Sequence, residues 1–316
     1  MRALVAILGA FALVSAGCGK TLAPPLATNA EVQARSRADA SHAFAALFSV
    51  YERALLVAEP LRLQNVSRCG DKVGGYLGWI AFADRDFGST QMRDLAAEVV
   101  RVGKSPVVVA LSPAAPAALA GVQIGDQIDS IDGKRVWTTE QVSRAERKLS
   151  AGKTPVSITR GGTGLVLEVE PARACAYDVV PVPSPGLDAA TRGSNIWVTL
   201  TLVDLANNDE LAFVIAHAMA RSLLGVDPER VTELVPEPEA TELAVALSEQ
   251  AGFSVDGVER VLELRAIEEP WTVIGTHNPL ANPFWRPKGD VMIGESARRI
   301  VALRAIRAGR ESAPAR

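Results

Sequence analysis

Histidine and cysteine are scarce in this chain, which has only three of each among its 316 residues. A Ser-His-Asp or Cys-His mechanism needs a histidine base beside its nucleophile, so with three histidines it finds little support. Net charge is small as well, because 36 acidic residues face 33 basic ones. Since no basic stripe runs among the few aromatic residues, the chain is not expected to bind nucleic acid.

A long apolar run is also missing from the amino terminus. Arg2 supplies a short positive region, and the apolar run from Ala3 to Val14 is too short to span a bilayer. The following residues, Ser15-Ala16-Gly17-Cys18, resemble the lipobox of bacterial lipoproteins, although Ser15 replaces the usual leucine. The resemblance implies a lipoprotein signal peptide at residues 1–18 with a lipid on Cys18. Simple secretion is the alternative.

The same resemblance predicts a location. Residues 19–28 would form an Ala/Pro-rich tether, and acyl chains would anchor the protein to a membrane without a transmembrane helix. Gly19 is not the aspartate that typically retains lipoproteins in the inner membrane. We therefore expect a lipid-anchored protein of the bacterial cell envelope, on the outer membrane and facing the periplasm.

Two cysteines, Cys69 and Cys175, remain once Cys18 is assigned to a lipid. They flank the central segment of the chain, and an oxidising compartment would favour a disulfide between them. Two separate buried thiols are the alternative. A disulfide would join the two ends of the central segment.

An N-terminal helical segment is expected at residues 29–68. Apolar residues recur at helical spacing from Asn29 to Glu59. Pro60 is expected to end the helix, because a proline removes a backbone donor and its ring clashes with the preceding turn.

The central segment carries two motifs that resemble PDZ domains. Tyr76-Leu77-Gly78-Trp79 resembles their carboxylate-binding loop, and residues 112–133 resemble the PDZ domains of HtrA-type bacterial proteases. The resemblance implies a PDZ-like domain at residues 69–175. It also implies that the C-terminus of a peptide adds as a strand after the loop. The matching peptide-binding positions are Leu77, Gly78, Trp79 and Ile80.

The residues themselves favour the same fold. Leu77, Trp79 and Ala81 alternate as in a strand, and Asp132-Gly133 suits a tight turn. Thr139 to Leu149 predicts an amphipathic helix, and Gly161-Gly162 predicts a hairpin turn.

Two interpretations of the loop residues stay open. Leu77 and Trp79 could simply be core residues, and the bulky Trp79 could fill the groove itself. Gly78 favours ligand binding, since a glycine between large apolar residues weakens a strand but permits a backbone to approach closely.

A histidine-containing helix is expected after residue 207. Asn207 and Glu210 suit an N-cap with its capping-box partner, and the following residues are nearly all apolar or small. The helix resembles the His-Glu-x-x-His helix of zinc proteases, in which two histidines hold zinc and the glutamate deprotonates water. Here His217 is retained, but Ala218 replaces the glutamate and Arg221 replaces the second histidine.

The order of motifs around this helix resembles the M48 family of zinc metallopeptidases. Asp209-Glu210-Leu211-Ala212 precedes the metal position, as in that family. Glu239-Ala240-Thr241 resembles its Glu-Ala-Asp motif, which makes Glu239 the matching third ligand. Thr276-His277-Asn278-Pro279 resembles its closing Thr-His-Pro segment. The resemblance implies a degenerate, mainly α-helical M48-like domain at residues 186–308, followed by a tail at 309–316.

The combined expectation is an α+β protein: a PDZ-like small β-barrel or sandwich with helices, followed by the M48-like domain. Zinc sites normally need three protein ligands, and a charged guanidinium cannot be one of them. We therefore expect a catalytically inactive pseudoprotease without a cofactor, which binds peptides or unfolded protein C-termini in envelope quality control. An active protease paralogue is a further candidate partner. The alternative is a residual metallopeptidase that holds zinc with His217, Glu239 and His277.

Overall fold

The computed structural model describes four stretches of the chain, which are residues 29–184, 186–225, 237–266 and 295–311. Two compact units make up the chain, Met1–Ala40 and Ser41–Arg316. The described part of the first unit is the beginning of helix α1, where Arg35 and Asp39 form an exposed ion pair at 3.0 Å. Cys18 lies outside the described residues, and so does His277. The predicted domain boundaries stay predictions.

Helix α1 extends from Asn29 to Gln64 and passes through Pro60. The expectation that Pro60 ends the helix was therefore wrong. Tertiary packing explains the difference, because the residues after the proline are held in place: Leu61 is fully buried and Arg62 is only 6% exposed. No helix in the described ranges is long and apolar enough to cross a membrane.

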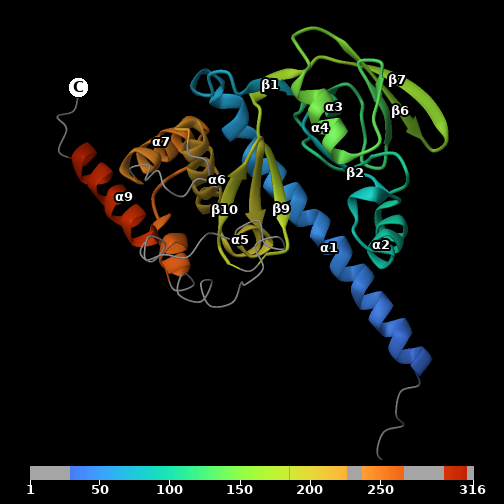
Figure 1. Cartoon of the computed structure of the whole chain (residues 1–316), viewed down its shortest axis with the longest axis horizontal. Helices are drawn as coiled ribbons and strands as arrows, with labels where there is room; N and C mark the ends of the chain where they lie inside the picture. Colours follow the sequence, from blue (N-terminus) through green and yellow to red (C-terminus); the bar gives the residue numbers. More distant parts are fainter. Residues whose placement is uncertain (1–28, 185, 226–236, 267–294, 312–316) are drawn as a thin grey trace, which may run out of the picture. The chain divides into compact units, whose positions relative to one another are not determined.

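An antiparallel sheet forms the PDZ-like part of the chain (Figure 1), in the order β2-β3-β4-β6-β7 with β5 beside β4. Its strands are β2 (Trp79–Phe82), β3 (Val107–Leu111), β4 (Gln127–Ile131), β5 (Lys134–Arg135), β6 (Thr154–Arg160) and β7 (Thr163–Val169). Its helices are η2 (Asp84–Asp86), α2 (Thr90–Val100), α3 (Pro116–Leu119) and α4 (Thr139–Arg147). The barrel expectation needs correction: among the described residues the sheet is open, with β2 and β7 at its two edges.

Local sequence signals account for much of this part. Gly161 and Gly162 turn the β6–β7 hairpin, and both have positive φ, at 55° and 84°. The predicted helix after Thr138 is α4, whose N-cap Thr138 accepts a hydrogen bond from the Gln141 N–H. These predictions are confirmed.

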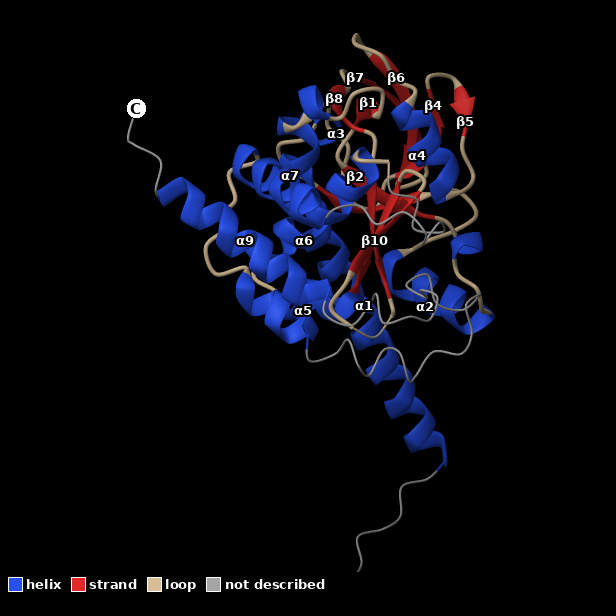
Figure 2. Cartoon of the chain, turned by 60° about the vertical axis from the view of Figure 1, so that its left-hand side comes forward, coloured by secondary structure: helices blue, strands red, loops and turns tan. Residues whose placement is uncertain are grey.

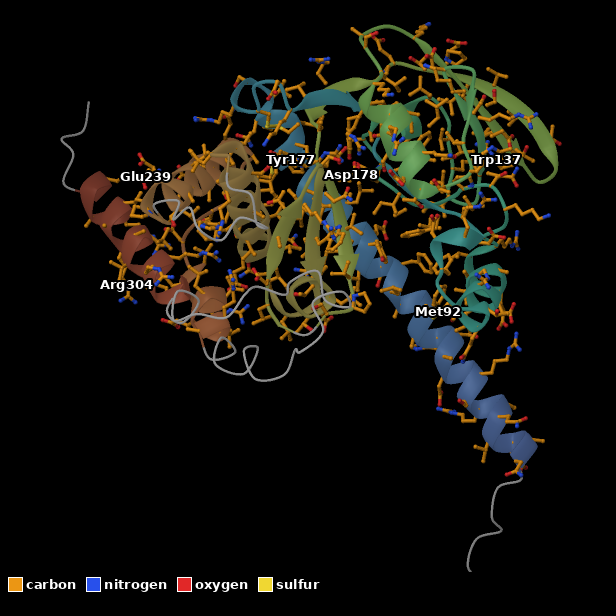
Figure 3. All side chains as sticks on the ribbon, viewed as in Figure 1. Met92, Trp137, Tyr177, Asp178, Glu239 and Arg304 are labelled. Atoms are coloured by element: carbon orange, nitrogen blue, oxygen red, sulfur yellow. A yellow bond between two sulfur atoms is a disulfide. The ribbon has the colours of Figure 1, made fainter. Side chains whose placement is uncertain are left out.

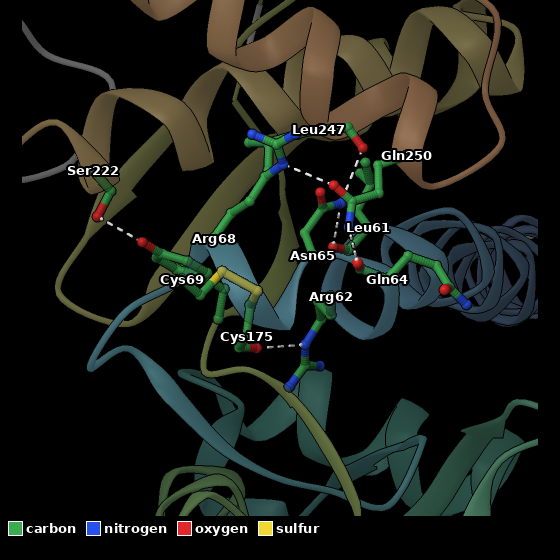
Figure 4. Close-up of a disulfide and its surroundings, with 11 residues drawn as sticks. Leu61, Arg62, Gln64, Asn65, Arg68, Cys69, Cys175, Ser222, Leu247 and Gln250 are labelled. Atoms are coloured by element: carbon green, nitrogen blue, oxygen red, sulfur yellow. Dashed lines mark hydrogen bonds between the residues drawn. A yellow bond between two sulfur atoms is a disulfide. The ribbon is translucent and has the colours of Figure 1, made fainter.

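A two-stranded sheet and a disulfide lie at the ends of the PDZ-like part (Figure 4). Strand β1 (Val73–Tyr76) pairs with β8 (Ala172–Cys175), and Cys69 is bonded to Cys175 just after the short helix η1 (Val66–Arg68). The Asn65 side chain donates to the carbonyl of Leu247 at 2.9 Å. The disulfide region is thus also hydrogen-bonded to the carboxy-terminal half.

The carboxy-terminal half combines a small sheet with helices (Figure 2). The sheet has the order β10-β11-β9, and β11 is parallel to β9. Its strands are β9 (Asp178–Val182), β10 (Ala189–Arg192) and β11 (Asn195–Thr199). The helices are α5 (Leu200–Leu205), α6 (Asn208–Leu223), α7 (Glu237–Gln250) and α9 (Glu295–Glu311), with a further helical stretch at 259–266. The expected mainly helical segment therefore begins with strands that the sequence analysis did not predict.

Helix α6 is the centre of this half. Asn207 and Glu210 form the predicted capping box, with bonds of 2.9 and 2.8 Å between each side chain and the other residue's N–H. Every residue from Glu210 to Ala220 is buried. The prediction of a helix packed on most of its circumference is confirmed. Helices α7 and α9 continue the packing, with α7 against α6 and α9 against α7.

Candidate peptide-binding site

The predicted carboxylate-binding loop connects β1 to β2. Its carbonyl groups are held by α3 and by the residue that follows β3: Ala117 of α3 donates to the Leu77 carbonyl at 3.0 Å, and Ser112 donates to the Gly78 carbonyl at 2.9 Å. Leu77 and Trp79 both belong to the buried core of the sheet. The side chains therefore point into the protein, so recognition of a ligand would depend on the backbone N–H groups of the loop.

Gly78 has a structural reason to be glycine. Its φ is +84°, and a Cβ atom here would lie 2.0 Å from the Cβ of Ala115. Both the backbone conformation and the close packing exclude a larger residue. The structure thus explains Gly78 without a ligand, which weakens the sequence argument that this glycine marks a ligand's approach.

Strand β2 is the edge next to the loop. Its described partner is β3 on one side, while its other side borders a pocket between β2 and α4. The pocket encloses about 620 Å³ of unfilled space, including its open mouth. An edge strand beside a helix is the geometry in which an extended peptide adds to a sheet.

Two further segments complete the pocket walls. Helix α1 contributes Tyr51 and Arg62, and β9 contributes Asp178. The Tyr51 ring packs edge-on against Phe82 of β2, with 5.1 Å between ring centroids, and its hydroxyl donates to the Pro181 carbonyl at 3.0 Å. The pocket is therefore lined from outside the PDZ fold as well as from within it.

One end of the pocket is closed by Thr139, the first residue of α4. Its hydroxyl lies 2.7 Å from the carbonyl oxygen of Ala81 in β2 and 2.6 Å from a carboxylate oxygen of Asp86. One hydroxyl proton is shared between these two acceptors. A peptide strand beside β2 is thus limited to the part of the groove between Ala81 and the loop.

The other end of the pocket holds a buried carboxylate. Glu146 of α4 is only 6% exposed, and its Oε1 accepts a hydrogen bond from the Leu77 N–H at 2.6 Å. Burial raises the pKa of Glu146 to about 7; the positive charge of Arg62 and the Leu77 N–H oppose the rise, and Asp178 adds to it. A loop N–H that a peptide carboxylate would use is therefore already bonded to a carboxylate of the chain itself.

Arg62 is a buried cation whose positive charge acts on this carboxylate. Its Nε donates to the Cys175 carbonyl at 3.2 Å, and its guanidinium lies over the Tyr76 ring, 4.5 Å from the centroid. Its Nη2 is also 3.9 Å from a carboxylate oxygen of Asp178 (labelled in Figure 3). Asp178 forms a closer pair with Arg147. Arg62 therefore adds positive charge next to the loop from a helix outside the PDZ fold.

Three residues of the pocket were not predicted from the sequence: Glu146, Arg62 and Asp178. A signal was present for Glu146: it follows Val142 by four residues and so lies on the buried face of an amphipathic helix, where glutamate is unusual. The assignment of Leu77, Gly78, Trp79 and Ile80 to peptide binding stays a prediction.

The predicted metal positions lie on two helices. His217 is 3% exposed and lies beside Phe213 within α6, where Ala218 is buried and Arg221 half-buried. Glu239, near the start of α7, is exposed (Figure 3). Among the described residues no group of three or more His, Cys, Asp or Glu side chains could hold a metal ion. His277 lies outside those residues, so the zinc alternative stays a prediction.

Comparison with known proteins identifies the central segment. Residues 107–159 match the family model of the PDZ domain, so the chain contains a PDZ domain, whose matched range covers β3 to β6 and α4. No curated protein sequence matches the chain.

Part of this chain is similar to two solved structures, one of an HtrA-type protease and one of an isolated PDZ domain. The HtrA-type protease AlgW with a decapeptide is 24% identical, with 32% of this chain and 30% of that chain covered and a TM-score of 0.27. The HtrA3 PDZ domain bound to a phage-derived ligand (FGRWV) is 18% identical, with 32% and 88% covered and a TM-score of 0.25. The present chain thus spans about a third of the AlgW chain that it matches.

Replacing Gly78 by alanine tests the account of the loop. We expect G78A to lower the free energy of unfolding by about 2–4 kcal/mol, because of the positive φ and the clash with Ala115. Gly164 of β7 is the control: its φ is ordinary and nothing lies within 4 Å, so G164A should change stability by less than about 0.5 kcal/mol. Urea denaturation measures both, and equal effects would contradict the account.

The raised pKa of Glu146 predicts a pH-dependent stability. Since the folded-state pKa is about 7 and the unfolded value about 4.5, the folded state loses stability as pH rises between these values. The natural chain should lose up to about 3 kcal/mol relative to Glu146→Gln between pH 4.5 and 8. Urea midpoints at several pH values measure the difference. Parallel pH profiles for the two chains would show that Glu146 ionises normally.

Proposed function

We propose that this protein binds the C-terminal segments of peptides or unfolded proteins through its PDZ domain. The bound segment would lie beside β2, in the groove between β2 and α4. The observation that carries the proposal is a hydrogen bond: the Leu77 N–H of the loop donates to the buried carboxylate of Glu146 at 2.6 Å. The PDZ match and the position of β2 at the edge of the sheet, beside a pocket, support it.

The proposed setting is the bacterial cell envelope, with the protein anchored by a lipid on Cys18 to the outer membrane and facing the periplasm. The lipobox-like residues Ser15 to Cys18 support this proposal. The disulfide between Cys69 and Cys175 fits it, because such bonds persist in oxidising compartments. Capture of exposed C-termini there would serve protein quality control.

For the carboxy-terminal half we propose an inactive M48-like scaffold that contributes a partner surface, with an active protease paralogue acting in trans as a candidate partner. Support comes from Ala218 and Arg221 in the positions of the catalytic glutamate and the second histidine. Losing a positioned general base typically costs about 10²–10⁴ in rate. The competing proposal is a residual metallopeptidase that uses zinc.

Selection from a random library with free C-termini tests peptide binding. We expect the full chain to enrich a C-terminal pattern, with apolar residues near the end, because the pocket beside β2 is largely apolar. The same library with amidated C-termini is the control and should yield no enrichment. Equal yield from both libraries, or no pattern from either, would contradict recognition of C-termini.

Metal content tests the scaffold proposal. After loading with zinc and removal of excess, the natural chain should hold none, whereas the double variant Ala218→Glu and Arg221→His should hold one zinc per chain. Adding His217→Ala to that variant should abolish binding, because it removes a ligand. Stoichiometric zinc in the natural chain would favour the metallopeptidase, with His277 as the first ligand to replace.

A further inference from the structure

We propose that Glu146 is an internal ligand of the PDZ loop, which occupies the place of a peptide's terminal carboxylate and must be displaced before a peptide binds. This inference rests on the proposed function and deepens it, since it concerns the regulation of the same site. In the state that the structure describes, the loop is occupied by the chain itself.

The hydrogen bond between Glu146 and the loop is short, and an ordered helix positions it. A carboxylate oxygen of Glu146 lies 2.6 Å from the Leu77 nitrogen, within the normal range for a charge-assisted hydrogen bond. Glu146 is delivered by α4, a helix whose start is fixed by the Thr138 cap and by the bond from Thr139 to Ala81. The carboxylate is thus held at the loop by an ordered helix rather than by a flexible segment.

The burial of Glu146 has a cost in free energy. A glutamate on an exposed helix face stays hydrated, whereas Glu146 is 6% exposed in a largely apolar pocket. Burying a charge is unfavourable unless donors and opposite charges compensate it. Here the compensating groups are the Arg62 guanidinium, the Leu77 N–H and the Trp79 indole. A backbone N–H and a guanidinium are also the groups that would receive a terminal carboxylate.

Acidic side chains outnumber basic ones around the loop. The anionic groups that face it are Glu146 of α4, Glu59 of α1 and Asp178 of β9; the cationic groups are Arg62 of α1 and Arg147 of α4. Glu59 is also the acceptor of a hydrogen bond from the Ser112 hydroxyl. With acidic groups already in excess, a second carboxylate at the loop is unfavourable while Glu146 stays ionised and in place. A peptide and Glu146 therefore compete.

In this competition only molecules whose loop is vacant can bind a peptide. The apparent affinity for the peptide is therefore the intrinsic affinity multiplied by the vacant fraction. If Glu146 occupies the loop in about nine of ten molecules, removing it strengthens binding about tenfold. The gain should require a free carboxylate on the peptide and a positive charge at Arg62.

The experiment uses the full chain and two fluorescent pools of random pentapeptides, one with free C-terminal carboxylates and one amidated. Fluorescence anisotropy is measured with the natural chain, Glu146→Ala, Glu146→Gln and the control Glu140→Ala. Glu140 lies on the same helix but is exposed and pairs with Arg144. We expect Glu146→Ala to bind the carboxylate pool about tenfold more tightly, with no gain for the amidated pool and none for Glu140→Ala.

A double variant tests the role of Arg62. Adding Arg62→Gln to Glu146→Ala should remove most of the gain, because the peptide carboxylate then loses its cation. Melting curves show whether each variant is folded, and Glu146→Gln replaces Glu146→Ala if the latter unfolds. Glutamine removes the charge but keeps a hydrogen-bond acceptor. The gain in affinity for the carboxylate pool should therefore be smaller for Glu146→Gln than for Glu146→Ala.

The outcomes separate the inference from the proposed function. If natural chain and Glu146 variants bind the carboxylate pool equally, and both prefer it to the amidated pool, the inference is wrong and the proposed function stands. If no folded chain distinguishes the two pools, both are wrong.

Discussion

The burial of one carboxylate, that of Glu146, constrains much of the central region. An ionised carboxylate in an apolar pocket needs donors and a counter-charge. The donor is the Leu77 N–H, so α4 and the loop before β2 are held together at this point. The counter-charge is Arg62, so α1 must lie against the same pocket. The residue that occupies the candidate site therefore also contributes to the packing of its walls.

Arg62 connects the site to the rest of the chain between residues 41 and 316. It stacks on Tyr76, bonds to the carbonyl of the disulfide-linked Cys175, and lies near Asp178 at the start of β9. Strand β9 pairs with β11 and so belongs to the carboxy-terminal sheet. The pocket beside β2 is thus lined by three parts of the sequence, and the proposed displacement of Glu146 would change the charge environment of all three.

Features with local causes could be predicted from the sequence. The Gly161-Gly162 hairpin, the helix after Thr138 and the capping box of Asn207 and Glu210 each depend on residues close together in the chain, and all three are present. Features with distant causes could not. Helix α1 continues past Pro60 because later segments bury Leu61 and Arg62, and β11 pairs in parallel with β9, which precedes it by more than ten residues in the chain. The role of Glu146 likewise depends on α1 and β9, which lie far from it in the sequence.

The amide proton of Leu77, observed by NMR in the full chain labelled with ¹⁵N-leucine, tests the central claim most directly. If the Glu146 carboxylate occupies the loop, this proton should exchange slowly with solvent. It should also shift as Glu146 titrates with a pKa of about 7, and it should lose that pH dependence in Glu146→Gln. A Leu77 amide that exchanges rapidly and ignores the titration of Glu146 would contradict the account.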